Sequence, residues 1–184
     1  LRLSMAASKV MARTMHDVPG SSLVTAMAFS CAEFGIQVSG LGDRWFTGPL
    51  PTFVDWRLED GFTADDMEFM GGESVITETA GLGGMAQAAA FPLHRSSGRS
   101  VATMIERTRA MYDITHAEHS WFKIPALDYR GTPLGIDVLK VAETGTTPIL
   151  DIGIAGRSHR QIGGGVASAP LAPFVEAAKA LRSL

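Results

Sequence analysis

Residues 122–165 constrain the fold of this chain more than any other stretch, because glycines and prolines interrupt a sequence that is otherwise apolar. The stretch reads FKIPALDYRGTPLGIDVLKVAETGTTPILDIGIAGRSHRQIGGG. A loop region of this length inside a compact domain is usually either functional or disordered, and this one is too apolar to be disordered. Glycine lets backbone N–H groups approach a ligand closely, and arginine offers a planar fork to a carboxylate or phosphate. The stretch therefore predicts part of an anion-binding site, with Arg130 on a tight turn.

The composition predicts one domain and argues against several classes of partner. The 184 residues are 46% hydrophobic and 19% charged, which allows a sizeable core, and we expect residues 1–184 to form a single α+β domain. The net charge of −3 and the scattered basic residues argue against nucleic acid and membrane surfaces. No apolar run is long enough to span a membrane. The single cysteine, Cys31, predicts a buried structural thiol in a reducing, cytoplasmic compartment.

Hydrophobic periodicity predicts helices and strands without a regular βαβ rhythm. Apolar residues at helical spacing predict helices at residues 1–15, 100–116 and 171–184, with Ser100 as the N-cap of the second. Short apolar or alternating runs predict strands at residues 23–30, 34–39, 74–78, 136–141 and 148–154. Residues 81–93 are small and apolar and predict a buried helix. The expected fold is α+β, with a mixed sheet, this buried Gly/Ala-rich helix and flanking amphipathic helices.

A second glycine cluster, Gly81, Gly83 and Gly84, is predicted to lie between a strand and a helix. That arrangement aims backbone N–H groups and the helix dipole at an anion, whereas close packing around Gly and Ala explains the same residues equally simply. GLGGMA is neither a Walker loop nor a good dinucleotide fingerprint, because it lacks the Lys-Ser/Thr of the first and the third glycine of the second. Glu78 lies next to this turn, where a carboxylate is suited to orient an amide or amine by accepting its N–H.

The predicted site combines cations with these glycine-rich turns. Arg130, Lys140 and Glu78 are assigned the catalytic roles. The predicted substrate- and anion-binding residues are Arg44, Gly81, Gly83, Gly84, Thr132, Asp137, Gly163 and Gly164. Arg44 follows Asp43 after a glycine turn, so these two residues form either part of a ligand-facing loop or a structural Asp–Arg bridge.

No metal site, cofactor or covalent nucleophile is predicted. His116 and His119 are three residues apart, which would bring two imidazoles together on one helical turn, but no third metal ligand is signalled. The chain lacks HExxH, CxxC and GxSxG motifs.

Four blocks of the sequence resemble one known family. They read EFGIQVSGLGDRWFTGP at residues 33–49, ESVITETAGLGGMAQAAA at 73–90, LDYRGTPLGIDVLKVAETG at 127–145 and ILDIGIAGRSHRQIGGGVASAP at 149–170. In content and order they are similar to the AllG-like family, also called YlbE-like, long catalogued as a domain of unknown function. The resemblance covers nearly all of the 184 residues.

The resemblance implies the C-terminal part of a longer subunit of an oxamate carbamoyltransferase, an enzyme of anaerobic allantoin degradation and purine catabolism. The implied reaction is reversible: oxalurate and phosphate give oxamate and carbamoyl phosphate. The implied assembly is a hetero-oligomer with a subunit that resembles acyl-CoA synthetases, with a homo-oligomer as the other possibility. The alternative function is a non-catalytic regulatory or scaffold subunit that binds a small anion in a multisubunit complex.

Residues 45–70 carry prolines and an acidic run, which predict an irregular, solvated loop. The segment also contains many large apolar side chains: Trp45, Phe46, Phe53, Trp56, Phe62, Met67, Phe69 and Met70. Such a segment is hard to bury within so small a domain, and exposed it would form a large apolar patch. We therefore expect it to pack against another subunit or against the N-terminal part of a longer protein.

Overall fold

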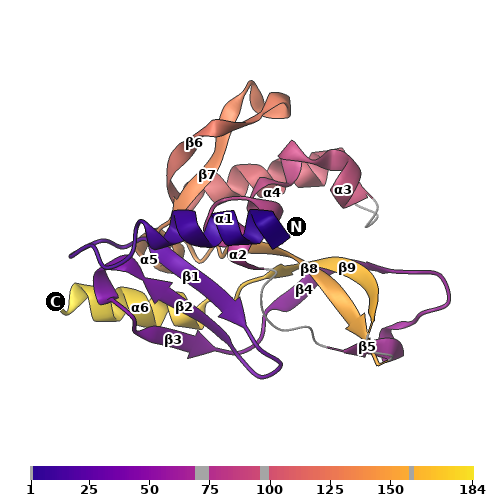
Figure 1. Ribbon diagram of the computed structural model, residues 1–184, viewed down its shortest axis with the longest axis horizontal. Helices are drawn as coiled ribbons and strands as arrows, with labels where there is room; N and C mark the ends of the chain where they lie inside the picture. The colour runs from indigo at the N-terminus through magenta and orange to yellow at the C-terminus, as the bar shows by residue number, and fades with distance from the viewer. Residues whose placement is uncertain (1, 69–74, 96–99, 158–159) are drawn as a thin grey trace.

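The computed structural model describes residues 2–68, 75–95, 100–157 and 160–184, and it confirms the predicted α+β class (Figure 1). The elements in chain order are α1 (Arg2–Arg13), β1 (Val24–Phe29), β2 (Phe34–Val38), η1 (Ser39–Leu41), β3 (Trp45–Gly48), β4 (Thr52–Leu58), η2 (Ala64–Asp66), β5 (Met67–Glu68), α2 (Ile76–Thr79), η4 (Gly83–Ala89), α3 (Phe91–Arg95), α4 (Val101–Asp113), β6 (Thr115–Ile124), η5 (Pro125–Leu127), β7 (Arg130–Ile136), α5 (Val138–Thr144), β8 (Ile149–Gly156), β9 (Gln161–Ser168) and α6 (Ala172–Arg182), where η marks a 3-10 helix.

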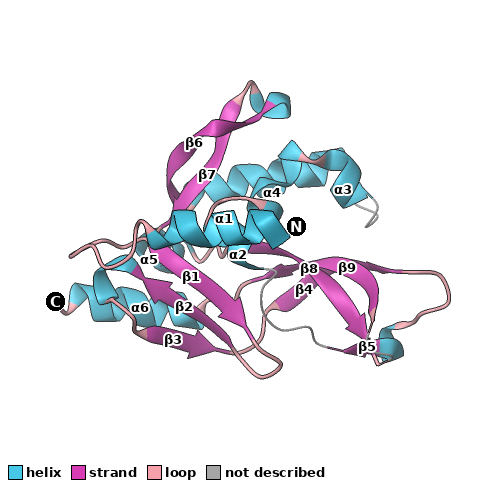
Figure 2. Ribbon diagram, in the orientation of Figure 1, coloured by secondary structure: helices cyan, strands magenta, loops and turns pink. Residues whose placement is uncertain are grey.

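The described strands form three separate sheets (Figure 2). The first has the order β1-β2-β3, the second has the order β4-β9-β8-β5, and β6 and β7 form a two-stranded hairpin. All of these strand pairs are antiparallel, so the expectation of a mixed sheet is wrong for the described part of the chain. Short connections such as those of β1–β2 and β8–β9 allow antiparallel pairing, whereas parallel pairs need long crossovers.

The main core lies between the first sheet, α6 and the β8–β9 pair. Every residue of β2 is buried, because α6 packs against β2 and β3 while α1 and α2 pack against β1. The buried rings of Phe34 and Phe174 stack with 6.3 Å between their centroids. The β6–β7 hairpin stands away from this core, and most of β6 is exposed (Figure 1).

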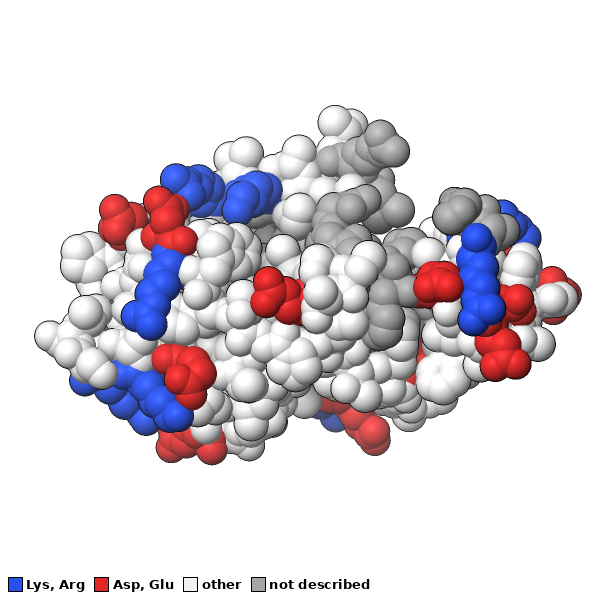
Figure 3. Space-filling view, turned by 90° about the horizontal axis from the view of Figure 1, so that it is seen from below, with Lys and Arg blue, Asp and Glu red and all other residues white. Residues whose placement is uncertain are grey.

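Charges of both signs are interspersed on the surface. In Figure 3, Lys and Arg side chains lie beside Asp and Glu side chains at both ends of the face shown, and a largely uncharged area lies between them. Arg160 and Glu59, for example, form an ion pair at 3.2 Å. None of the described helices is long and apolar enough to cross a membrane.

The expectation of an irregular loop at residues 45–70 is wrong for much of that segment. It contains the strands β3 and β4, and Pro49 and Pro51 lie between these strands rather than within them. Exposed and less exposed side chains alternate along most of β4, as expected for a strand at the edge of its sheet. Residues 69 and 70 lie outside the described residues.

The aromatic side chains of this segment do not form a closed core within the chain. Trp56 is 47% exposed, and Phe62 is half-buried beneath the guanidinium group of Arg160, which lies 4.9 Å from its ring. The packing of the segment against another subunit stays a prediction.

Most of the expected helices are confirmed. The first, second and last predicted helices correspond to α1, α4 and α6, and the Ser100 hydroxyl caps α4 by accepting the N–H of Thr103 at 3.1 Å. The Gly/Ala-rich segment is helical and buried, but it is the 3-10 helix η4, kinked at Ala86, followed by the short α3. The strands expected at residues 23–30, 34–39 and 148–154 correspond to β1, β2 and β8.

Two expected strands are helices. Residues 76–79 form α2, while Ser74 lies outside the described residues. The strand expected at residues 136–141 ends at Ile136, because the Asp137 side chain accepts the N–H of Leu139 at 2.9 Å and so caps α5. Gly145 ends α5 in the left-handed conformation. Cys31 is exposed in the turn after β1, so the expectation of a buried thiol is also wrong.

The glycines of residues 163–165 lie inside β9, between β4 and β8, rather than in a ligand-binding turn. A Cβ atom on Gly163 would lie 2.4 Å from the carbonyl oxygen of Arg57, and one on Gly165 would lie 2.8 Å from the ring of Phe53. Close approach of the neighbouring strand therefore explains these glycines.

Candidate functional site

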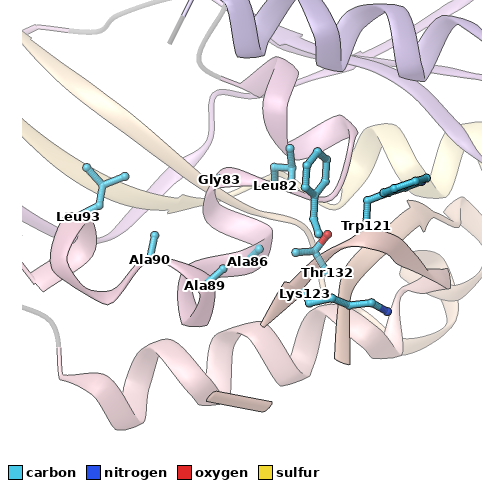
Figure 4. Close-up of a pocket in the computed structure, with 10 residues that line it drawn as sticks. Leu82, Gly83, Ala86, Ala89, Ala90, Leu93, Trp121, Lys123 and Thr132 are labelled. Carbon is cyan, nitrogen blue, oxygen red and sulfur yellow. The ribbon is translucent and has the colours of Figure 1, made fainter. Parts of the chain in front are cut away.

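A pocket of about 470 Å³ lies between η4 and the β6–β7 hairpin. Small and apolar side chains form most of its wall, and Lys123 and Thr132 supply the polar side chains (Figure 4). The lining residues are Leu82, Gly83, Ala86, Ala89, Ala90, Leu93, Trp121, Phe122, Lys123 and Thr132.

The sequence of η4 explains why there is space beside it. Gly83, Ala86 and Ala89 are three residues apart, which is the repeat of a 3-10 helix, and all three line the pocket. Their small side chains leave room that larger residues would fill. On the other side the hairpin contributes Trp121, which is 83% exposed, and Phe122.

Thr132 places a buried hydroxyl in the pocket wall. The residue is only 2% exposed, and its Oγ1 atom has no hydrogen-bond partner among the residues that the structure describes. A buried polar atom without a partner carries a desolvation cost, which a ligand atom in the pocket would relieve. Lys123 lies on the neighbouring strand, opposite Gly131. Among the described residues the side chain of Lys123 forms no ion pair or hydrogen bond, although its charge acts on Glu118 and His119, so a cation is present at the pocket.

The glycine turn does cradle an anion, but that anion is the chain's own Glu78. This side chain is fully buried, and its Oε1 atom accepts the N–H groups of Gly84 at 2.9 Å and Asp151 at 3.0 Å. Its Oε2 atom accepts the hydroxyl of Thr77 at 2.9 Å. Burial raises the pKa of Glu78 to about 7, although these hydrogen bonds oppose the rise. Glu78 does not itself line the pocket.

Gly81 joins the two predicted glycine regions. Its φ angle is +75°, and a Cβ atom there would lie 1.8 Å from the carbonyl oxygen of Pro133. This close approach sets the turn against β7, so that Gly83 and Thr132, which are far apart in the sequence, line one pocket. The structure thus brings together part of the predicted site.

Arg130 is held within the hairpin instead of lining the pocket. It lies on β7, not on a tight turn, and its Nε and Nη2 atoms donate to Oε1 of Glu118 at 2.9 and 2.6 Å. Its guanidinium group also lies 3.8 Å from the centre of the Tyr112 ring. The other Glu118 oxygen accepts the N–H of Gly131 at 2.9 Å. Hydrogen bonding from Arg130 lowers the pKa of Glu118.

Several other predicted site residues have contacts elsewhere and do not line the pocket. Lys140 donates to the carbonyl oxygen of Thr115, and Asp137 caps α5. Arg44 lies 4.5 Å above the ring of Phe46 in the first sheet. The alternative prediction was an ion pair between Asp43 and Arg44. The Asp43 carboxylate instead contacts His16 at 3.0 Å and Arg13 at 3.8 Å. Gly163 and Gly164 lie in β9.

The histidine pair does not lie on a helical turn. His116 and His119 are on β6, and His119 packs against Phe122 with 4.3 Å between ring centroids. Within the described residues no group of three His, Cys, Asp or Glu side chains is arranged to hold a metal ion.

Sequence reasoning missed Lys123 and Glu118. Lys123 carries no motif of its own, and only the pairing of β6 with β7, which sets it opposite Gly131, brings it to the same pocket as Thr132. Glu118 would have been found as the partner of Arg130 if the hairpin had been predicted, because residues opposite one another on paired strands make contact.

Comparisons with known proteins identify relatives over nearly the whole chain. A family model described as oxamate carbamoyltransferase subunit AllG matches residues 1–74. The oxamate carbamoyltransferase subunit AllG of Escherichia coli (strain K12) is 40% identical over 187 residues, which cover 98% of this chain and 44% of that protein. The uncharacterized protein YahG of the same organism is 35% identical over 175 residues, which cover 94% of this chain and 37% of that protein.

A solved structure has the same fold. The crystal structure of a conserved protein of unknown function from Enterococcus faecalis V583 matches with a TM-score of 0.92 and 40% identity, over 98% of this chain and 44% of that chain. This chain spans less than half the length of the curated relatives that it matches. With its sequence blocks, its fold and these relatives in agreement, the chain belongs to the AllG family.

Proposed function

We propose that this chain is the C-terminal part of an oxamate carbamoyltransferase-type subunit and that its pocket binds a small anionic amide. The support is its 40% identity, along 98% of its length, to a protein named as such a subunit. Because the chain corresponds to only 44% of that relative, the complete activity would need residues from a longer protein. We propose that residues 1–184 form one domain of it.

The proposed chemistry is the transfer of one carbamoyl group. A phosphate oxygen attacks the terminal carbamoyl carbon of oxalurate and forms a C–O bond, while the C–N bond to the oxamate nitrogen breaks. The proton released by phosphate goes to that nitrogen, so the products are carbamoyl phosphate and oxamate. Negative charge grows on the carbamoyl oxygen, so hydrogen-bond donors and cations fixed in a pocket would accelerate the step.

The observation that carries the proposal is the buried, unpartnered hydroxyl of Thr132 beside the unpaired cation of Lys123. A hydroxyl can donate to a carboxylate or carbonyl oxygen, and an ammonium group neutralises one negative charge. The alanine face of η4 keeps water away from the apolar side of a ligand. Arg130 contributes indirectly in this proposal, by holding β6 and β7 together through Glu118.

The test uses the full-length protein with its partner subunit and measures the phosphorolysis of oxalurate. Thr132→Val, which keeps the shape and removes the hydroxyl, should weaken substrate binding by about tenfold or more, as expected for a lost hydrogen bond to a charged group. Thr132→Ser keeps the hydroxyl and is the matched control. Lys123→Gln should also raise KM, whereas Lys179→Gln on α6, where the lysine pairs with exposed Glu176, should not. Unchanged kinetics of both Thr132→Val and Lys123→Gln would exclude the pocket as the substrate site.

A second candidate is a non-catalytic regulatory or scaffold role in a multisubunit complex. The observation in its favour is that Arg130 and Lys140 already have partners within the chain, so that few cations are free to act on a substrate. Calorimetric titration with oxamate, phosphate and carbamoyl phosphate separates the two functions. Binding without turnover, even after the partner subunit is added, would favour the regulatory role.

We propose a cytoplasmic hetero-oligomer with a subunit that resembles acyl-CoA synthetases, or else a homo-oligomer. The exposed indoles of Trp45 and Trp56, at 46% and 47%, are the candidate contacts. Trp56→Glu should weaken this assembly in analytical ultracentrifugation, and an unchanged assembly would remove residues 45–70 from the interface.

A further inference from the structure

The carboxyl group of Glu78 lies directly beneath the floor of the pocket. Gly83 lines the pocket, and a Cβ atom on Gly83 would lie 2.4 Å from Oε1 of Glu78 and 3.0 Å from Oγ1 of Thr77. One glycine residue therefore separates the buried carboxyl group from a ligand in the pocket. Because glycine has no side chain, nothing larger than its backbone stands between them.

The hydrogen bonds of Glu78 fix the shape of that floor. Its Oε1 atom accepts the N–H of Gly84 at the start of η4 and the N–H of Asp151 on β8. The carboxyl group thus ties the turn that carries Gly83 to a strand of the second sheet. Loss of this acceptor would leave the two N–H groups without a partner, and the turn would be free to shift.

The same geometry accommodates the carboxylate and the neutral acid. Oε1 accepts both N–H groups in either form, since a protonated carboxyl group keeps one acceptor oxygen. A proton on Oε2 can donate to the hydroxyl oxygen of Thr77, 2.9 Å away, which now donates to Oε2. The charge beneath the pocket can therefore change while the heavy atoms stay in place.

Few charged groups lie close enough to Glu78 to fix its protonation state. Among the described residues no ion pair involves it, and η4 and β1 carry no charged side chain. The elements that contact α2 and η4 carry more charges. With their side chains described, these are Lys9 and Arg13 on α1, Glu106, Arg107, Arg109 and Asp113 on α4, and Asp151 on β8. On the strands of the hairpin the charged or titratable groups are His116, Glu118, His119, Lys123 and Arg130. Burial is what brings the pKa of Glu78 to about 7.

We propose that Glu78 is a positioning residue of the pocket, and that an anion bound above Gly83 selects its neutral, protonated form. The reason is that two negative charges separated by one glycine repel each other, and the burial of the Glu78 carboxyl group limits the screening of that repulsion by water. When the anion binds, Glu78 takes up a proton from solvent, and the turn that carries Gly83 keeps its shape because the hydrogen bonds of Glu78 remain. The inference rests on the proposed function, because it needs an anion in this pocket.

The test is isothermal titration of the full-length protein with oxamate, whose carboxylate does not titrate between pH 6 and 8. Titrations in buffers of different ionisation enthalpy measure the protons taken up. We expect the wild type to take up a fraction of a proton at pH 7, and to bind oxamate up to about tenfold more weakly at pH 8 than at pH 6. Glu78→Gln, which is always neutral, should take up none and should bind at pH 8 as it does at pH 6. Glu106→Gln, at an exposed position on α4, should behave as the wild type does.

The outcomes separate the two proposals. Equal proton uptake in the wild type and Glu78→Gln would overturn the role of Glu78 and assign the titration to another group, such as His119, while leaving the anion pocket intact. No oxamate binding by the wild type at either pH would overturn the pocket, and this inference with it. Glu78→Ala, which removes the acceptor, should lose binding at both pH values. Normal oxamate binding by Glu78→Ala would contradict the positioning role of Glu78. If Glu78→Ala does not fold, the proton uptake and pH dependence of Glu78→Gln test the proposal.

Discussion

Two glutamates near the pocket make similar hydrogen bonds but have opposite electrostatic behaviour. Glu78 accepts the N–H of Gly84 at 2.9 Å, and Glu118 accepts the N–H of Gly131 at 2.9 Å. Burial raises the pKa of the first, which forms no ion pair with a described residue, whereas the hydrogen bond from Arg130 lowers the pKa of the second. The difference shows that a glycine N–H does not by itself determine the charge of a bound carboxyl group. Burial and the presence of a cation decide it.

The turn of Glu78 and the strand of Arg130 meet at Gly81, so a change there should have the largest effect. A methyl group on Gly81 would overlap the carbonyl oxygen of Pro133, and its φ angle of +75° disfavours alanine as well. We expect Gly81→Ala to lower the free energy of unfolding by more than about 4 kcal/mol, which places it among the exceptional single substitutions.

Gly145→Ala is the matched control for that substitution. Gly145 has a similar φ of +73°, but a Cβ atom there would meet nothing within 4 Å. This variant should lose only about 1 kcal/mol, from backbone conformation alone. Urea denaturation of both variants measures the difference. Equal losses would mean that the contact between the turn and β7 is unimportant.

The pH dependence of stability should differ between the two glutamates, first through Glu78. Its pKa is raised from 4.5 to about 7 on folding, so between these values the folded state binds more protons than the unfolded state. The stability of the wild type should therefore fall as pH rises through this range, by about 3 kcal/mol relative to Glu78→Gln. Denaturation of both proteins from pH 4.5 to 8 tests this. Parallel curves would mean that Glu78 stays ionised when buried.

Glu118 should show the smallest effect and the opposite sign. Its pKa is lowered on folding, so its stabilisation is present above the unfolded pKa and is lost as pH falls through the folded value. Because both side chains of the pair are more than a third exposed, Glu118→Gln should cost less than about 1 kcal/mol at pH 7, and added salt should reduce the loss. A salt-independent loss of several kcal/mol would contradict the assignment of this pair to the surface.

Local sequence signals predicted much of the fold. Ser100 and the apolar periodicity after it identify α4, because a cap and a helical stripe are properties of one short segment. Asp137 was less informative, since the same residue type serves as a helix cap and as a ligand, and it was assigned to the wrong role. The edge strand β4 was missed because its partner β9 is distant in the sequence.

The sequence identified only part of the candidate pocket. Gly83 and Thr132, which were predicted to bind an anion, both line it, and their role in binding stays a prediction. Arg130 is the residue type that binds anions, but sequence alone does not reveal that Glu118 pairs with it. The same holds for Glu78, because its burial depends on β8 and η4 together. A sequence thus identifies groups able to bind an anion, whereas the fold determines which anion, internal or external, each group meets.

The position of β9 has a consequence for the order in which the molecule can form. Thr52 at the start of β4 pairs with Ser168 at the end of β9, and α6 packs against β2 and β3 only after the chain has passed residue 172. As a chain emerges from the ribosome N-terminus first, β4 lacks its partner β9 until residues 161–168 have been made. Folding that depends on such distant pairs is intrinsically slow. Loss of β9 would therefore leave β4 and β8 with unpaired edges exposed to aggregation, and loss of α6 would uncover part of the first sheet.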